Sequence, residues 1–276
     1  MNPHQEHLAT PHALVSSLWR NRSLINQLVR REVIGRYRGS VLGVAWSFFN
    51  PVLMLLVYTF VFSVVFKTRW GVGGDEGHAS FAIILFVGMI VHGLFAEVAN
   101  RAPTLILSNV SYVKRVVFPL EILPIVTMGS ALFHASISLI VLFLAQLILM
   151  NQLPWTLILF PLIVAPLILG AMGVAWFLAA IGVYVRDIAQ TIGIVTSVMM
   201  FLAPVFYPIT ALSERLQWLL YLNPITFVIV EGRKVLLFGL MPNWGGWLLY
   251  TAVSIGIALG GFWWFQKTRK GFADVV

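Results

Sequence analysis

The chain has 276 residues, of which 59% are hydrophobic and 10% charged, and its formal net charge is +8. Soluble domains carry about 25% charged residues, so this composition excludes a domain whose whole surface faces water. The absence of cysteine excludes disulfides and thiolate metal ligands.

The first 39 residues divide into a polar start and a basic amphipathic segment. Residues 1–12 contain His4, His7 and His12, and we expect a flexible terminus here rather than a metal site. Residues 13–39 predict a helix, because apolar side chains recur at 3.6-residue spacing and arginines lie mostly around the other faces. Such a helix is expected to lie in the cytoplasmic membrane interface. Its apolar positions are Leu14, Val15, Leu18, Trp19, Ile25, Leu28 and Val29, and its interface arginines are Arg30, Arg31, Arg36 and Arg38.

Long runs without Asp, Glu, Lys or Arg predict the membrane spans. They are residues 39–66, 77–96, 122–185, 188–213 and 235–266. A membrane-spanning helix needs about 20 apolar residues, and the run 122–185 is long enough for two, with a polar turn at 151–154. The sequence therefore predicts an all-α integral membrane protein, in which residues 40–276 form one domain of six transmembrane helices.

The loop of residues 100–118, between the second and third spans, contains an apolar stretch that predicts a short helix on the cytoplasmic face. Proline is tolerated in the first turn of a helix, where Pro103 stands. An apolar helix that faces the cytoplasm needs a partner with a groove, and the alternative is a loop resting on the membrane. The residues of this candidate coupling segment are Arg101, Ala102, Pro103, Thr104, Leu105, Ile106, Leu107, Ser108, Asn109 and Val110.

Residues 208–243 depart from the six-helix pattern. The uncharged stretch between Arg215 and Glu231 is 15 residues long, which is about 22 Å of helix and less than the ~30 Å hydrocarbon core. Irregular backbone at membrane depth is tolerated only inside protein or beside water. We expect two short re-entrant helices that line or close the outer mouth of a pathway, and the alternative is an outer-face cap. The candidate outer-gate residues are Trp218, Tyr221, Asn223 and Pro224.

The distribution of basic residues predicts the orientation. With a cytoplasmic N-terminus, 13 of the 18 Lys and Arg residues lie in cytoplasmic segments, as the positive-inside rule requires. Both termini are therefore expected in the cytoplasm, and the net positive charge indicates topology rather than nucleic-acid binding.

Enzymatic motifs are absent from the sequence. It has no phosphate-binding loop, no paired catalytic carboxylates and no carboxylate in the middle of a span, so we expect neither an enzyme, nor a metal site, nor an energy source within this chain. Glu97 can pair with Arg101, and Glu231 with Lys234, as helix-surface clamps.

Small and aromatic residues populate the spans. The pairs Gly170/Gly173 and Gly256/Gly260 are expected to permit close helix packing within the bundle, and the alternative is a seam between two chains. Composition alone leaves open whether the aromatic side chains contact a sugar, lipid or one another.

A series of short motifs resembles the membrane subunit of polysaccharide-exporting ABC transporters, which serve O-antigen, teichoic acid and related surface glycans. The motifs run in family order from about Leu14 to the C-terminus; each is weak alone, and the series is fairly specific. They are Arg36-Tyr37-Arg38-Gly39-Ser40 with Leu42-Gly43, Trp46 and Asn50-Pro51, then Phe118-Pro119, Leu123-Pro124, Arg186-Asp187-Ile188, Pro204-Val205-Phe206-Tyr207, Leu222-Asn223-Pro224 and Gly271-Phe272-Ala273-Asp274.

The resemblance implies a homodimer in a bacterial inner membrane, bound to two copies of a separate ATPase that binds ATP and Mg²⁺. It implies that the segment 102–110 docks in a groove of the ATPase, with the N-terminal helix nearby. It further implies that the re-entrant helices shape an outer gate. A lipid-linked glycan would pass along a channel of aromatic residues, for which the candidates are Trp46, Phe49, Tyr58, Phe206 and Tyr207.

Two other functions are compatible with parts of the sequence. A related ABC permease that exports drugs or lipids would share these motifs, and neighbouring genes for glycosyltransferases would favour the glycan. A structural or assembly membrane protein without transport fits the interrupted segment 208–243 less well, and failure to bind any ATPase would favour it.

Overall fold

The computed structural model describes residues 10–65, 78–113 and 118–275, and within these ranges the chain forms helices and connecting turns, with no strand. Most of the predicted flexible start, residues 1–12, lies outside the described residues. The α-helices are α1 (Pro11–Arg20), α2 (Arg22–Arg36), α3 (Trp46–Tyr58), α4 (His78–Arg101), α5 (Val110–Val113), α6 (Leu123–Met150), α7 (Phe160–Tyr184), α8 (Ile188–Leu202), α9 (Glu214–Tyr221), α10 (Pro224–Leu236), α11 (Trp244–Thr268) and α12 (Phe272–Val275).

Short helical turns extend several of these helices. The 3₁₀ turns are η1 (Gly43–Ala45), η3 (Ala102–Thr104), η4 (Leu107–Asn109), η5 (Leu120–Ile122), η6 (Trp155–Leu159), η7 (Ile209–Ala211) and η8 (Arg269–Gly271), and η2 (Thr59–Val65) is a π-helix that continues α3.

Among the described residues, five helical stretches are long and apolar enough to cross a membrane. They are Gly43–Phe62, Phe81–Thr104, Leu120–Met150, Trp155–Tyr184 and Trp244–Val275. The remaining predicted span, 188–213, contains α8, whose 15 residues cover about 22 Å and are too few to cross ~30 Å of hydrocarbon unaided. The chain is therefore a membrane protein whose described residues form helices and turns, with five helices of spanning length among them.

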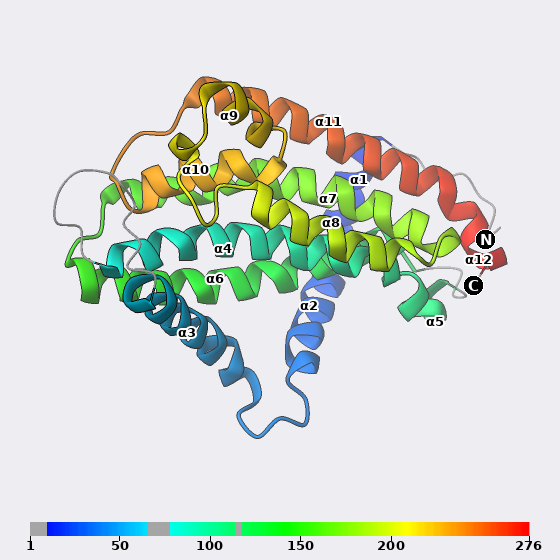
Figure 1. The fold of residues 1–276 in the computed structure, drawn as a ribbon. Helices are drawn as coiled ribbons and strands as arrows, with labels where there is room; N and C mark the ends of the chain where they lie inside the picture. Colours follow the sequence, from blue (N-terminus) through cyan, green and yellow to red (C-terminus); the bar gives the residue numbers. More distant parts are fainter. Residues whose placement is uncertain (1–9, 66–77, 114–117, 276) are drawn as a thin grey trace.

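The core of the bundle is α4, which lies between α6, α7 and α10 (Figure 1). Its residues Ala82, Ile83, Leu85, Val87 and Val98 have no exposed surface. A helix that is apolar on every side lies either inside a protein or in a membrane. In α4 the protein itself covers the apolar surface, since 83% of its spanning window is buried, against 22% for the window of α11.

Glycine sets the distance between α7 and α11. A Cβ atom at Gly173 would lie 2.7 Å from Cα of Ala258, and one at Gly261 would overlap the backbone of Gly173. Close packing is thus confirmed at Gly173. For Gly256 and Gly260 the prediction is wrong within one chain, because a Cβ at either would meet no described atom within 4 Å.

The predicted N-terminal helix is two helices, α1 and α2, which meet at Asn21. The apolar face of α2 packs on the protein: Leu28 is buried with Ile122 and Val126. Gly129 permits α2 to cross α6 closely, because it has no Cβ atom; a Cβ there would collide with the side chain of Val29. Protein contacts, rather than lipid alone, therefore position α2.

Figure 1 shows α2 leaving the bundle and α3 returning to it at an angle, so that α3 meets the other helices mainly through its last turns. Most apolar side chains of α3 are therefore exposed in the single chain, including Phe49, Leu53 and Leu56.

The segment 208–243 contains two short helices, with a break at the predicted place. Asn223 caps α10: its side chain accepts a hydrogen bond from the backbone N–H of Ile225 and donates to the carbonyl of Met199. The other end of α10 is fixed where Gln146 donates to the carbonyl of Leu236 and Thr156 to that of Val235. These bonds satisfy carbonyls that a helix end leaves free.

Candidate functional site

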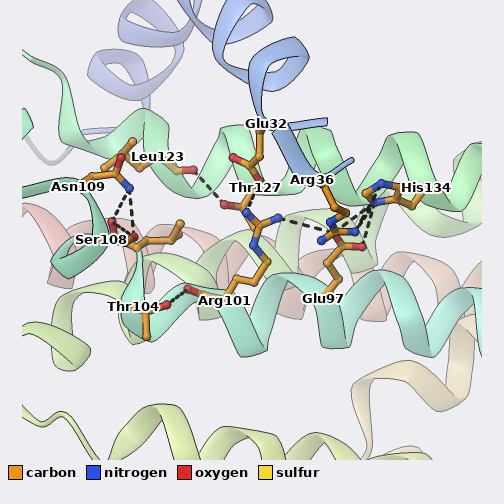
Figure 2. A network of polar contacts seen from close by, with 11 residues as sticks. Glu32, Arg36, Glu97, Arg101, Thr104, Ser108, Asn109, Leu123, Thr127 and His134 are labelled. Carbon is orange, nitrogen blue, oxygen red and sulfur yellow. Dashed lines mark hydrogen bonds and ion pairs between the residues drawn. The ribbon is translucent and has the colours of Figure 1, made fainter. Parts of the chain in front are cut away.

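A cluster of charged side chains joins α2, α4 and α6 (Figure 2). Its centre is Glu97 on α4, whose Oε1 lies 2.6 Å from Nη2 of Arg36 on α2 and 3.3 Å from Nδ1 of His134 on α6. Arg36 Nη1 is also 2.9 Å from Nδ1 of His134. The cluster thus ties three helices whose residues are far apart in sequence.

A second ion pair extends the cluster by one helical turn. Nη2 of Arg101 lies 2.6 Å from Oε1 of Glu32 on α2. Nη1 of Arg101 lies 3.7 Å from Oε1 of Glu97, which confirms the predicted pairing along α4. Isolated surface pairs contribute little to stability, but a shared network of partly buried charges resists separation of its elements, because each lost partner leaves a desolvated charge.

The end of α2 adds contacts around the cluster. The ring of Tyr37 meets that of His134 edge to face at 6.1 Å, and burial raises the pKa of the Tyr37 phenol above its ordinary value, so it stays neutral at physiological pH. Arg31 donates to the hydroxyl of Tyr112 on α5, whose ring stacks on Phe118. The N-terminal segment therefore contacts the loop that follows α4.

The four predicted interface arginines divide into two groups. Arg36 belongs to the cluster and Arg31 contacts α5. Arg30 and Arg38 are exposed, where they can remain at a charged membrane surface.

The candidate coupling segment forms η3, η4 and α5 rather than one short helix; residues 114–117 of its loop lie outside the described residues. Ala102 and Ile106 are fully buried, and Pro103 packs on α7 at Gly182, where a Cβ would overlap its carbonyl. The exposed members are Thr104 and Ser108, and Leu107, Asn109 and Val110 are partly exposed. Leu105 is buried and Arg101 belongs to the cluster.

Because its apolar side chains pack inward, this segment presents a mainly polar surface. The side chains of Ser108 and Asn109 donate to the carbonyl of Leu105, and such bonds stabilise short turns. The expectation of an apolar helix facing the cytoplasm is therefore corrected: the apolar residues attach the segment to α7, because Gly182 leaves room for them.

A second polar contact point was not found by sequence reasoning. Glu121 is 7% exposed; its carboxylate accepts from Ser17 of α1 at 2.8 Å and from Arg269 of η8 at 2.7 Å. Trp176 of α7 donates to its backbone carbonyl. A lone carboxylate between apolar residues was the available signal, because such a group needs partners; the sequence could not indicate which.

Among the candidate pathway residues, Phe206 and Tyr207 lie in an aromatic group near the ends of α3 and α8. Phe206 stacks on Phe62 at 6.3 Å and on Phe201 at 5.6 Å, and Tyr207 donates to the carbonyl of Phe201. Tyr58 is half-buried.

Trp46 and Phe49 belong to the other end of α3, and both are exposed. The structure of one chain therefore places the five candidate aromatics along α3 and beyond α8, but it does not gather them into one cluster.

The candidate gate residues surround the break between α9 and α10. Trp218 and Tyr221 are exposed, and the carbonyl of Pro224 accepts from Tyr250 of α11 at 2.7 Å. A mostly apolar cavity of about 530 Å³ lies beside them, between α7, α10 and α11. In the part of the chain that the structure describes, no three His, Asp or Glu residues are grouped to hold a metal ion.

Comparison of the sequence with known proteins found a matching family and several relatives. A family model described as ABC-2 type transporter matches residues 23–237. The chain is 26% identical over 265 residues to an O-antigen export system permease protein of Myxococcus xanthus, covering 95% of this chain and 99% of the relative. Two O-antigen export system permease proteins of Klebsiella pneumoniae are each 23% identical and cover 92% of this chain and 95% of their own length.

Proposed function

We propose a function for this chain on the premise that it belongs to the ABC-2 type transporter family, whose model spans residues 23–237. The chain is the membrane-spanning permease of a polysaccharide-exporting ABC transporter. The observation that carries this conclusion is the similarity to O-antigen export permeases over at least 92% of the chain. The helical arrangement as a whole, rather than one motif, is therefore expected to be shared.

A permease of this class works with a separate ATPase. ATP hydrolysis is supplied by that partner, and ATP and Mg²⁺ bind there rather than to this chain. The assembly holds two copies of the ATPase and two of this chain. The exposed apolar faces of α3 and α8, such as Leu53 and Phe201, support pairing of two chains, because a second copy would cover them inside the membrane.

The proposed topology has six membrane-crossing segments, with α8 as the short fifth segment and both termini in the cytoplasm of a bacterial inner membrane. The break at Asn223 and the burial of α10 against α4 and α7 support a re-entrant arrangement of α9 and α10. Irregular backbone at this depth is tolerated because protein surrounds it.

The coupling segment transmits ATPase movement to α2 and α3. The ATPase contacts the exposed side of 102–113, near Thr104 and Ser108. Movement of this segment reaches α2 through Arg101 and Glu32 and through Tyr112 and Arg31. Since α2 is joined to α3 by a short turn (Figure 1), its tilt shifts the first spanning helix.

The cargo is a lipid-linked, O-antigen-like surface polysaccharide. Aromatic faces stack on apolar sugar faces, and the group around Phe206 and Tyr207, together with Trp46, Phe49 and Tyr58, offers such faces along α3 and beyond α8. Little charge is needed for this contact, which agrees with the uncharged surface of these helices.

Depletion of the chain from its host tests the proposed function. We expect lipid-linked glycan to accumulate on the cytoplasmic side while the surface polymer disappears. Restoration of surface polymer by the re-expressed chain is the control. Normal surface glycan together with changed efflux of drugs or lipids would instead identify the related exporter of those compounds.

A further inference from the structure

Arg233 joins three segments in the interior of the bundle. It belongs to α10 and is 5% exposed. Its guanidinium donates to three backbone carbonyls: Nε to Ile84 at 3.0 Å, Nη1 to Pro204 at 2.5 Å and Nη2 to Val205 at 2.9 Å. Ile84 belongs to α4, and the other two residues follow the end of α8.

The break after α8 requires such a donor. Pro204 and Val205 lie beyond the last helical residue, Leu202, and both are buried. Among the described residues, no backbone N–H donates to either of these two carbonyls. A buried carbonyl without a donor is costly, and in a membrane no bulk water replaces it.

Only arginine has the geometry for this arrangement. Its planar guanidinium directs five N–H groups in fixed directions, whereas lysine offers one flexible ammonium. Gly88 of α4 makes room for it: a Cβ there would lie 3.1 Å from Nη2 of Arg233 and 3.2 Å from Cα of Val205.

The contact also positions aromatic residues. Phe206 follows Val205 directly, and its ring stacks on Phe62 of η2 and Phe201 of α8. The carbonyl bonds of Arg233 therefore fix the start of the turn that places Phe206 and Tyr207.

We propose that Arg233 is a positioning residue. It holds the non-helical turn after α8 against α4 and α10, and thereby sets the positions of Phe206 and Tyr207. Its consequence for export rests on the proposed function, since these two aromatics are assigned there to the glycan pathway. The positional claim itself is independent of the cargo.

Cross-linking measures the position directly, because the chain has no natural cysteine. Cysteines replacing Phe62 and Phe206 are joined by a short bifunctional thiol reagent in isolated membranes. We expect Arg233→Gln to slow cross-linking about tenfold, because this change removes one or more of the hydrogen bonds that the charged guanidinium donates to the buried carbonyls. Arg233→Lys is expected to give an intermediate rate. Lys234→Gln is the matched control, because this neighbouring cation pairs with Glu231 and should leave the rate unchanged.

A second variant, Gly88→Ala, tests the same contact if Arg233→Gln fails to fold. Its methyl group crowds the guanidinium and Val205 without removing a hydrogen-bond donor, so cross-linking should slow by several-fold. Gly93→Ala on the same helix is the control, because a Cβ there meets no described atom within 4 Å. Equal rates in Gly88→Ala, Arg233→Lys and the unmodified background would overturn the proposal.

Export assays separate this proposal from the proposed function. Export is measured for Arg233→Gln in the chain that keeps Phe62 and Phe206, because Phe206 is itself assigned to the pathway. Slower cross-linking, together with loss of surface glycan in that variant, supports both. Slower cross-linking in a chain whose depletion leaves surface glycan normal supports the positioning role and contradicts the glycan function. Unchanged cross-linking contradicts the positioning role, whatever the cargo.

Discussion

At the scale of single residues, Glu97 is the connecting point between the N-terminal segment and the bundle. It pairs with Arg36, Arg101 and His134, which come from α2, α4 and α6. Its side chain is 17% exposed and that of Arg36 38% exposed. The pairs are therefore less screened by water than surface pairs, and their desolvation cost is smaller than that of a fully buried pair.

Glu97→Gln is expected to lower stability by about 1–3 kcal/mol, because two arginines lose a charged partner that water replaces only in part. The measurement is the loss of folded, detergent-solubilised protein on heating. Glu214→Gln, an exposed carboxylate on α9, is the control and should have no effect. Glu97→Arg alone places a cation beside Arg36 and Arg101 and should cost more, and Arg36→Glu added to it should recover part of that further loss. Equal melting of Glu97→Gln and the wild type would contradict a structural role for the cluster.

At the scale of elements, the coupling segment is attached to the bundle by its apolar side and exposes its polar side. Ala102 is fully buried and η3 packs on α7, so a large residue at this position would disturb folding. Thr104, two residues later, is exposed. A probe of ATPase docking therefore belongs at Thr104 or Ser108.

Thr104→Arg is expected to reduce co-purification of the ATPase at least tenfold while membrane insertion stays normal, because the large cation alters only the exposed side. Ala102→Arg should reduce the amount of folded protein instead. Gln152→Arg, exposed in the turn after α6 that is proposed to lie on the outer face, is the control. Full co-purification with Thr104→Arg and Ser108→Arg would place the docking surface elsewhere.

The sequence predicts the helices of this protein better than the contacts between them. Apolar runs predict the spanning helices, and Asn223-Pro224 predicts the break before α10, because hydrophobic length and proline act locally. The pairing of Glu97 with Arg101 follows from helical spacing. Its pairing with Arg36, 61 residues earlier, depends on how α2 crosses α6 at Gly129, and spacing carries no information about such a crossing.

Further differences have the same cause. The apolar side of 102–106 turns inward because Gly182 on α7 leaves space, and nothing within the loop indicates that partner. Likewise, the partners of Glu121 come from α1 and η8, which lie far away in sequence.

At the scale of the whole molecule, the proposed topology has the turn after α6 on the outer face and α12 in the cytoplasm. Gln152 and Asp274 are both exposed, so single cysteines there test the orientation on a cysteine-free background. In spheroplasts, a membrane-impermeant maleimide should label Gln152→Cys at once and Asp274→Cys only after permeabilisation. The reverse pattern would require the opposite topology and would move the coupling segment away from any cytoplasmic ATPase.

We propose that ATPase movement reaches the glycan pathway through the ion-pair cluster of this chain. The deciding measurement is the amount of lipid-linked glycan moved per ATP hydrolysed, in vesicles that contain the purified permease and its ATPase. We predict ATP-dependent glycan movement that requires both proteins, and a severalfold lower ratio for Glu97→Gln, while ATP hydrolysis continues. An unchanged ratio in that variant, or ATP hydrolysis without any glycan movement in the wild type, would contradict the account.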